Sequence, residues 1–229
     1  MKLVVFDIDG TLADTKEVDD ACFIASFYTT FKIDIRHQKW EEITHLTDWG
    51  ITEEIIQKHW NRNPTAEEYR LMESTLINNL KVKQKEDATS FQEITGANAF
   101  FHQLQKMPNI RLGIATGAWE KSALLKLGSV GINPIGIPFS NSNHFKTREQ
   151  ITNRTIHLAV QKNAASFEEI IYFGDGVWDY KTCQNLGIRF IGIDVLQNDK
   201  LKNLGAKTVF QDFRAVSYTH LTLPTIYSV

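Results

Sequence analysis

The sequence predicts an α/β fold: a Rossmann-like parallel sheet flanked by helices, with an inserted small α-helical cap domain. Two observations lead to this expectation. Short apolar runs recur at wide intervals and end in small or acidic residues, at 3–6, 111–115, 170–173, 189–193 and, more weakly, 207–210. Helix-like segments separate these runs, and strands that alternate with helices favour a parallel sheet with right-handed crossovers. One long segment interrupts the alternation and predicts the insertion.

The first apolar run, 3–6, leads directly into Asp7-Ile8-Asp9-Gly10-Thr11. This pattern indicates a buried strand that brings two carboxylates to the rim of a sheet. Because buried carboxylates are costly without partners, a cation or a proton is expected beside them. Asp and Gly are also common in turns, so the pattern alone leaves a purely structural turn open.

The interrupting segment, 16–89, contains no run of the buried-strand type and only one glycine, Gly50. A capping-box pattern at 65–68 predicts a helix that extends to about Leu80. We therefore expect a helical cap over 16–89, connected near Asp14 and near 85–90. The remaining residues, 1–15 and 90–215, are expected to form the α/β core.

Helix signals also mark the second half of the chain. Asn98 is a candidate N-cap for 99–106, and the capping-box pattern at 147–150 predicts a helix to about Gln161. A third helix is expected over 179–185, ended by Gly187.

Composition limits the functional classes. The 229 residues are 42% hydrophobic and 23% charged, with a net charge of −2, so nucleic acid and anionic membranes are not expected partners. Two distant cysteines, Cys22 and Cys183, favour a reducing compartment, and no apolar run approaches the length of a membrane span. We expect a cytoplasmic, soluble monomer or homodimer.

The last residues, 216–229, continue neither a helical nor a strand period. They resemble the in-frame translation of a sequencing adaptor. We therefore expect a non-native tail there and exclude it from fold reasoning.

Residues that follow the predicted strands should meet at one edge of the sheet, because ligands bind outside the carboxyl ends of parallel strands. They include Asp7, Asp9, Thr116-Gly117 and 174–179, which reads Gly-Asp-Gly-Val-Trp-Asp. The segment 7–11, Thr116, a basic residue near 148 and the segment 174–179 resemble, in this order, the four motifs of the haloacid dehalogenase-like hydrolases. The resemblance covers about 1–214, and the insertion resembles the helical cap of the phosphoglycolate phosphatase and β-phosphoglucomutase branch.

The resemblance implies a role for each acidic residue. Asp7 corresponds to the nucleophile that forms an aspartyl-phosphate, and Asp9 to the general acid and base. Mg²⁺ prefers oxygen donors, and the resemblance implies three ligands for it: the Asp7 carboxylate, the Asp175 carboxylate and the backbone carbonyl of Asp9. Asp179 is expected to support this site without binding the metal directly; a helix-terminal acid that complements the helix dipole is the structural alternative.

The resemblance also implies phosphate contacts. Thr116 corresponds to a hydroxyl that donates to a phosphoryl oxygen, although it could instead cap a turn. For the basic residue we favour Arg148, because it lies in the first turn of the helix opened by Thr147, where a side chain can reach back over the site. An arginine there would bind phosphate through two parallel hydrogen bonds. Lys146 stays open as the alternative.

Substrate contacts are expected from Thr11, Gly117, Trp49 and Trp178. For cap residues such as Trp49, burial in a helical core is the competing interpretation.

The leading hypothesis is thus a Mg²⁺-dependent phosphatase that acts on a small phosphorylated metabolite. A phosphomutase of the β-phosphoglucomutase type uses the same motifs and stays open, as does a catalytically silent binding domain. The intact set of acidic residues argues against the silent domain, which has no need to bear their electrostatic cost.

Overall fold

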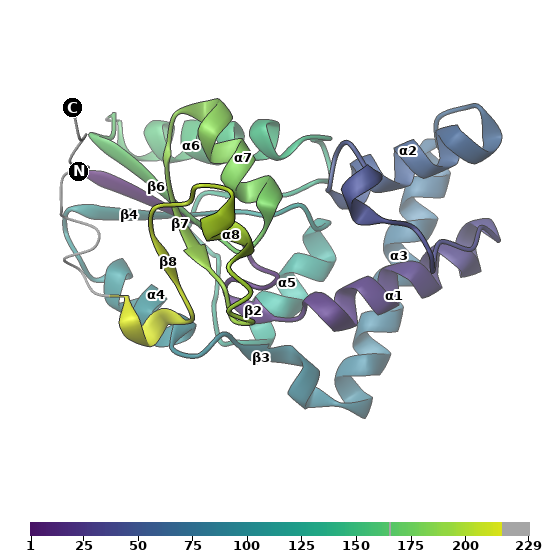
Figure 1. Cartoon of the computed structure of the whole chain (residues 1–229), viewed down its shortest axis with the longest axis horizontal. Helices are drawn as coiled ribbons and strands as arrows, with labels where there is room; N and C mark the ends of the chain where they lie inside the picture. Colours follow the sequence, from purple (N-terminus) through teal and green to yellow (C-terminus); the bar gives the residue numbers. More distant parts are fainter. Residues whose placement is uncertain (165, 217–229) are drawn as a thin grey trace.

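The computed structural model describes residues 1–164 and 166–216, and it confirms the predicted α/β class. Its main sheet has six strands in the order β5-β4-β1-β6-β7-β8, and every neighbouring pair is parallel (Figure 1). The strands are β1 (Lys2–Phe6), β4 (Ile110–Ala115), β5 (Phe139–Ser140), β6 (Glu169–Gly174), β7 (Arg189–Ile193) and β8 (Val209–Phe210). Apart from Val216, the predicted non-native tail lies outside the described residues.

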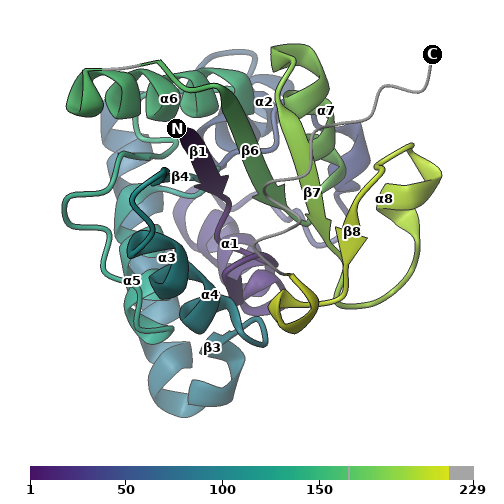
Figure 2. The same ribbon diagram turned by 90° about the vertical axis from the view of Figure 1, so that its left-hand side faces the viewer.

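Alternating side chains of β1 face two different hydrophobic layers, because successive residues of a strand point to opposite faces. Val4 and Phe6 pack on the side of α4 (Ala97–Gln105) and α5 (Glu120–Ser129). Leu3 and Val5 pack on the side of α6 (Arg148–Asn163) and α7 (Val177–Leu186). Figure 2 shows α6 and α7 above the sheet and α4 and α5 below it. The sheet is therefore buried on both faces, which its apolar strands require.

The central position of β1 brings three strand ends together. Phe6 pairs with Ile114 of β4 on one side and with Phe173 of β6 on the other. The backbone N–H of Asp7 also donates to the carbonyl of Phe173, at 3.0 Å. The residues that follow β1, β4 and β6 consequently share one edge of the sheet.

The segment predicted to be helical forms α1 (Lys16–Phe31), α2 (Asp48–Trp60) and α3 (Ala66–Glu86), which lie beyond that edge (Figure 1). These helices have a hydrophobic core of their own, which includes Phe27, Ile56 and Leu76. A two-stranded antiparallel ribbon, β2 (Ala13–Asp14) with β3 (Gln92–Glu93), joins the points where the chain enters and leaves this segment. The domain boundaries stay a prediction.

Two predicted helix starts and one predicted helix end are confirmed. Thr65 and Thr147 form the capping boxes of α3 and α6, and Gly187 ends α7 with a φ of 65°. The predicted cap Asn98 is wrong: α4 begins at Ala97, and the Asn98 amide donates instead to the carbonyl of Val130 at 2.7 Å. A tertiary hydrogen bond thus overrides the local capping preference.

The remaining described elements are short. They are the 3₁₀ turns Trp40–Glu42, Ala88–Phe91 and Phe213–Ala215, and α8 (Lys200–Asn203). Over 1–164 and 166–216, no helix is long and apolar enough to cross a membrane.

Candidate active site

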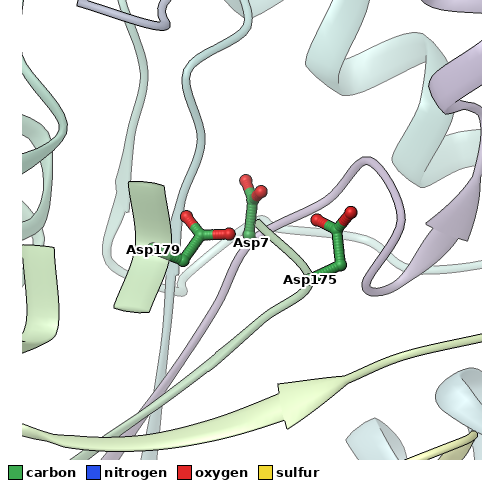
Figure 3. A group of neighbouring side chains, drawn as sticks. All are labelled: Asp7, Asp175 and Asp179. Carbon is green, nitrogen blue, oxygen red and sulfur yellow. The ribbon is translucent and has the colours of Figure 1, made fainter. Parts of the chain in front are cut away.

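Three carboxylates converge at the sheet edge. Asp7 follows β1, Asp175 follows β6, and Asp179 lies in the first turn of α7. One oxygen of each lies within 4.8 Å of one oxygen of the other two, and the side chains project from different segments toward a common space (Figure 3). The structure therefore brings together the three acids expected from two separate motifs.

Burial makes this cluster electrostatically costly. Asp7 is only 2% exposed, and Asp179 is fully buried. Burial raises the pKa of Asp7 and of Asp179 above the ordinary value, although Arg148 opposes both shifts. Burial also raises the pKa of Asp175 to about 6, against the opposing charge of Lys16. Because an opposite charge nearby favours the ionised form of a carboxyl group, a cation bound beside these three groups would offset the cost of their burial.

Arg148 supplies one positive charge directly. Its Nη1 lies 3.2 Å from Asp7 Oδ2 and 3.3 Å from Asp179 Oδ1, and its Nε donates to the carbonyl of Leu46 at 3.0 Å. Gly117 allows this placement, because a Cβ there would lie 2.7 Å from the Arg148 guanidinium. The guanidinium is thus fixed between the carboxylates and the helical segment.

Two carboxylate oxygens keep free coordination capacity. Asp7 Oδ1 and Asp175 Oδ1 are buried and have no hydrogen-bond partner among the described residues. The oxygens of Asp179, in contrast, accept from Tyr172 Oη at 3.3 Å and from the Gly176 N–H at 3.0 Å. Unpartnered buried oxygens are costly, and an all-oxygen donor set suits Mg²⁺, so the residues present fit this ion.

Gly10 brings the Asp7 loop close to Asp175. Its φ of 76° is a left-handed conformation, and a Cβ would lie 2.4 Å from Asp175 Oδ2. Only glycine combines this conformation with this close approach.

Asp9 is not a member of the three-carboxylate cluster, although it lines the same cavity as Asp7. Its Oδ1 accepts from Thr15 Oγ1 at 2.6 Å, and Lys126 Nζ lies 2.8 Å from its carboxylate. The same Nζ lies 2.5 Å from Asp19 Oδ1 on α1. Burial alone would lower the pKa of Lys126, but the carboxylates of Asp19, Asp9 and Asp48 raise it above its ordinary value.

Sequence reasoning missed Lys126 and Asp19. A lysine within a helix is usually solvated, whereas Lys126 is completely buried. The one available signal is its position on the same face of α5 as Ser122 and the preceding Trp119, both of which are buried.

Lys16, the first residue of α1, reaches back to the sheet edge. Its Nζ lies 2.7 Å from Asp175 Oδ2 and 4.9 Å from the centre of the Trp178 ring. Trp178 is predicted to touch substrate, and its buried Nε1 has no partner among the described residues.

The other phosphate-contact candidates are buried around this edge. Thr116 is 1% exposed at the end of β4, and its Oγ1 accepts from the N–H of Ala118 at 3.2 Å. Thr11 is fully buried, with a hydroxyl that has no partner in the described part of the chain.

A cavity of about 100 Å³ lies between the sheet edge and the helical segment. The core side contributes Asp7, Asp9, Gly117, Ala118, Arg148 and Trp178, and the helical side contributes Lys16, Asp19, Asp20, Phe23, Trp40, Leu46, Thr47, Asp48 and Ile51. The two sides touch directly, because the Asp48 N–H donates to the carbonyl of Gly117 at 2.8 Å. Both parts of the chain therefore enclose the cavity.

Trp49 and Lys146 lie elsewhere, because both are bound to Glu53. The Trp49 indole donates to Glu53 at 3.2 Å and packs on Tyr69, while Lys146 forms an ion pair with the same carboxylate. Neither residue lines the cavity. The tryptophan of the segment 40–50 that does line it is Trp40.

The acidic cluster lies at the carboxyl end of the central strand of a parallel sheet, which is the edge where α/β enzymes bind their ligands. The model of the haloacid dehalogenase-like hydrolase family matches residues 4–193, and the chain belongs to this family of hydrolases.

Solved structures support the same fold. CbbY from Rhodobacter sphaeroides, in complex with phosphate, has a TM-score of 0.71 at 17% identity, over 96% of this chain and 99% of that one. β-Phosphoglucomutase from Clostridium difficile has a TM-score of 0.70 at 15% identity, over 96% and 95%. A hydrolase from Pseudomonas syringae has a TM-score of 0.70 at 17% identity, over 93% and 94%. No curated protein matches the sequence.

Proposed function

We propose that this protein is a Mg²⁺-dependent phosphatase that hydrolyses a small phosphorylated metabolite through an aspartyl-phosphate on Asp7. One observation carries the proposal: the buried Asp7 carboxylate lines the cavity with one oxygen against Arg148 and the other unpartnered. A carboxylate held in this way is oriented, and as a lining residue it would lie beside a ligand bound in the cavity.

The residues present account for both halves of the reaction. A carboxylate oxygen of Asp7 attacks phosphorus, the bond from phosphorus to the ester oxygen breaks, and Asp9 gives a proton to the departing oxygen. Water then attacks the aspartyl-phosphate and gives a proton to Asp9. The bond from phosphorus to the Asp7 oxygen breaks, and inorganic phosphate and the Asp7 carboxylate are regenerated.

Arg148 is the group that we assign to phosphate binding. It is positioned beside the attacking oxygen and keeps its charge at all relevant pH values, because the pKa of an arginine lies far above neutrality. Fixed positive charge at the transferring group lowers the barrier without reorganisation during the reaction. Thr116 and the backbone near Gly117 are proposed to hold the remaining phosphoryl oxygens.

Asp7, Asp175 and the backbone carbonyl of Asp9 are proposed to hold Mg²⁺, with Asp179 fixing Arg148 beside them. When bound, the ion would offset the repulsion between the Asp7 carboxylate and a phosphate dianion. The unpartnered oxygens of Asp7 and Asp175 support this assignment.

We assign residues 16–89 as the cap that selects the substrate. Trp40, Phe23 and Ile51 form an apolar part of the cap side of the cavity. Thr11, Gly117 and Trp178 remain proposed contacts on the core side.

A panel of phosphorylated metabolites, assayed with and without Mg²⁺, tests this function. We expect release of inorganic phosphate from at least one small phosphate ester, dependent on Mg²⁺ and absent in Asp7→Asn. The same reactions should be analysed for isomerised sugar phosphate, because isomerisation without phosphate release would instead establish a phosphomutase. Phosphate release that persists at the wild-type rate in Asp7→Asn would contradict the proposed mechanism.

A further inference from the structure

Lys126 is a completely buried cation at the boundary between the α/β core and the helical segment. It lies on α5 of the core, yet its Nζ contacts Asp9 of the sheet edge at 2.8 Å and Asp19 of α1 at 2.5 Å. Asp19 and Asp9 both line the cavity. Lys126 therefore links a residue of the reaction centre to the first helix of the cap.

Asp9 is fixed from two directions. Thr15 Oγ1 donates to its Oδ1 at 2.6 Å, and Lys126 contacts the carboxylate at 2.8 Å. The threonine lies just before α1 and the lysine lies on α5, so two separate parts of the chain limit rotation of the carboxylate.

Stability alone is a poor explanation for this arrangement. Burying an ammonium group carries a large desolvation penalty, and apolar residues of similar volume often replace buried ion pairs at no cost in stability. Lys121, on the same helix, shows the usual alternative, since it is mostly exposed and forms only a 3.4 Å pair with Glu73. The buried position of Lys126 thus calls for a role that an apolar residue could not fill.

We propose that Lys126 is a positioning residue that orients the Asp9 carboxylate for proton transfer and, through Asp19, couples this orientation to helix α1 of the cap. The inference rests on the proposed function, in which Asp9 protonates the leaving oxygen and later accepts a proton from water. Lys126 itself is not among the residues that line the cavity.

p-Nitrophenyl phosphate separates the two proton transfers. Its leaving group departs without protonation, so formation of the aspartyl-phosphate needs no acid, whereas breakdown still needs Asp9 as the base. In Lys126→Met we expect a burst of about one equivalent of p-nitrophenol per enzyme, followed by steady turnover that is slowed roughly 10- to 100-fold. A purely structural defect would reduce the amount of active enzyme and create no burst.

A second variant covers the case in which Lys126→Met folds poorly because two buried carboxylates lose their cation. Lys126→Met/Asp19→Asn also removes one of these negative charges. We expect it to regain thermal stability and to keep the burst and the slow steady phase, because Asp9 still lacks its partner. Lys121→Met is the matched control on the same helix, and we expect wild-type kinetics from it.

Wild-type turnover in the double variant, or equal slowing of both steps without a burst, would overturn the positioning role. An equal burst in Lys121→Met would also overturn it. Absence of phosphate release from p-nitrophenyl phosphate and from every ester of the metabolite panel would contradict the proposed function itself and, with it, this role.

Discussion

Arg148 Nη1 lies 3.2 Å from Asp7 Oδ2, so the only cation that touches the proposed nucleophile within the described residues comes from the first turn of α6. The capping box of Thr147 sets where that helix begins, and the Nε of Arg148 is held by the carbonyl of Leu46. Local sequence and a contact from the helical segment together orient the guanidinium.

The two basic residues of this segment should therefore differ in effect. We expect Arg148→Ala to lower kcat by about 10²–10³, as loss of a donor at a reacting centre does. Lys146→Ala removes a half-exposed ion pair with Glu53 and should leave kcat within about twofold. Steady-state kinetics on the best substrate of the panel measures both. Near-normal turnover in Arg148→Ala, alongside an inactive Lys146→Ala, would reverse the assignment.

Metal binding should depend on Asp175. We expect Mg²⁺ to raise the melting temperature of the wild-type protein, with about 2.7 kcal/mol of stabilisation at a concentration 100 times its Kd. Asp175→Asn should lose most of this shift, and titration calorimetry should show weakened binding. Asp14→Asn, a change at an exposed carboxylate, is the control. An unchanged Mg²⁺ affinity in Asp175→Asn would contradict the assignment.

Gly10 offers a test of the close approach between the Asp7 loop and Asp175. Gly10→Ala introduces both left-handed strain, about 1 kcal/mol or more, and a contact with the Asp175 carboxylate. Gly187→Ala is the matched control, because Gly187 has a similar positive φ and open space around its Cβ position. We expect both variants to lose stability but only Gly10→Ala to lose Mg²⁺ affinity in calorimetry. Equal affinities would show that Asp175 adjusts freely.

Asp48 should make the metal-free protein less stable as the pH rises. Burial raises the pKa of Asp48 to about 8 from an ordinary value of 3.8. Between these values the folded state holds a proton that the unfolded state has lost, so the free energy of unfolding falls with increasing pH. The contribution of one such group is at most about 1.4 kcal/mol per pH unit.

Asp48→Asn should make this slope shallower by the share of Asp48, because an amide does not ionise and can still accept from the Trp119 N–H, as Asp48 Oδ2 does at 2.8 Å. The other buried carboxyls whose pKa is raised, among them Asp175, keep their share. Urea unfolding between pH 5 and pH 8 in the presence of a chelator measures the effect, with Asp14→Asn again as the control. A slope in Asp48→Asn as steep as that of the wild type would contradict the assignment.

The sheet and its acidic edge could be predicted because parallel strands place their carboxyl ends together, whatever lies between them in the sequence. The positions of Asp7, Asp175 and Thr116 follow from this rule alone. Arg148 was also predictable, since the Thr147 capping pattern fixes the first helical turn.

The sequence does not predict the place of residues whose position depends on contacts between distant parts of the chain. The sequence around Lys126 is that of an ordinary helical lysine, and its place on the same face of α5 as Ser122 is only a weak signal of burial. The contact with Asp19 of α1, a residue more than 100 positions away in the chain, accounts for its buried charge. Trp49 and Trp40 look equivalent in sequence, but Glu53 binds the Trp49 indole and holds it outside the cavity. Contacts between the cap and the core, rather than local pattern, decide which cap residues face the site.

The central claim, that Asp7 carries the phosphoryl group, is tested most directly by trapping that group during turnover. Enzyme mixed with Mg²⁺ and p-nitrophenyl phosphate would be quenched in acid, reduced with borohydride and digested with trypsin. Because reduction converts an aspartyl-phosphate to homoserine, mass spectrometry of peptide 3–16 should find homoserine at position 7, and none without substrate. Phosphate release with an unmodified Asp7, or with homoserine at position 9 instead, would contradict the mechanism.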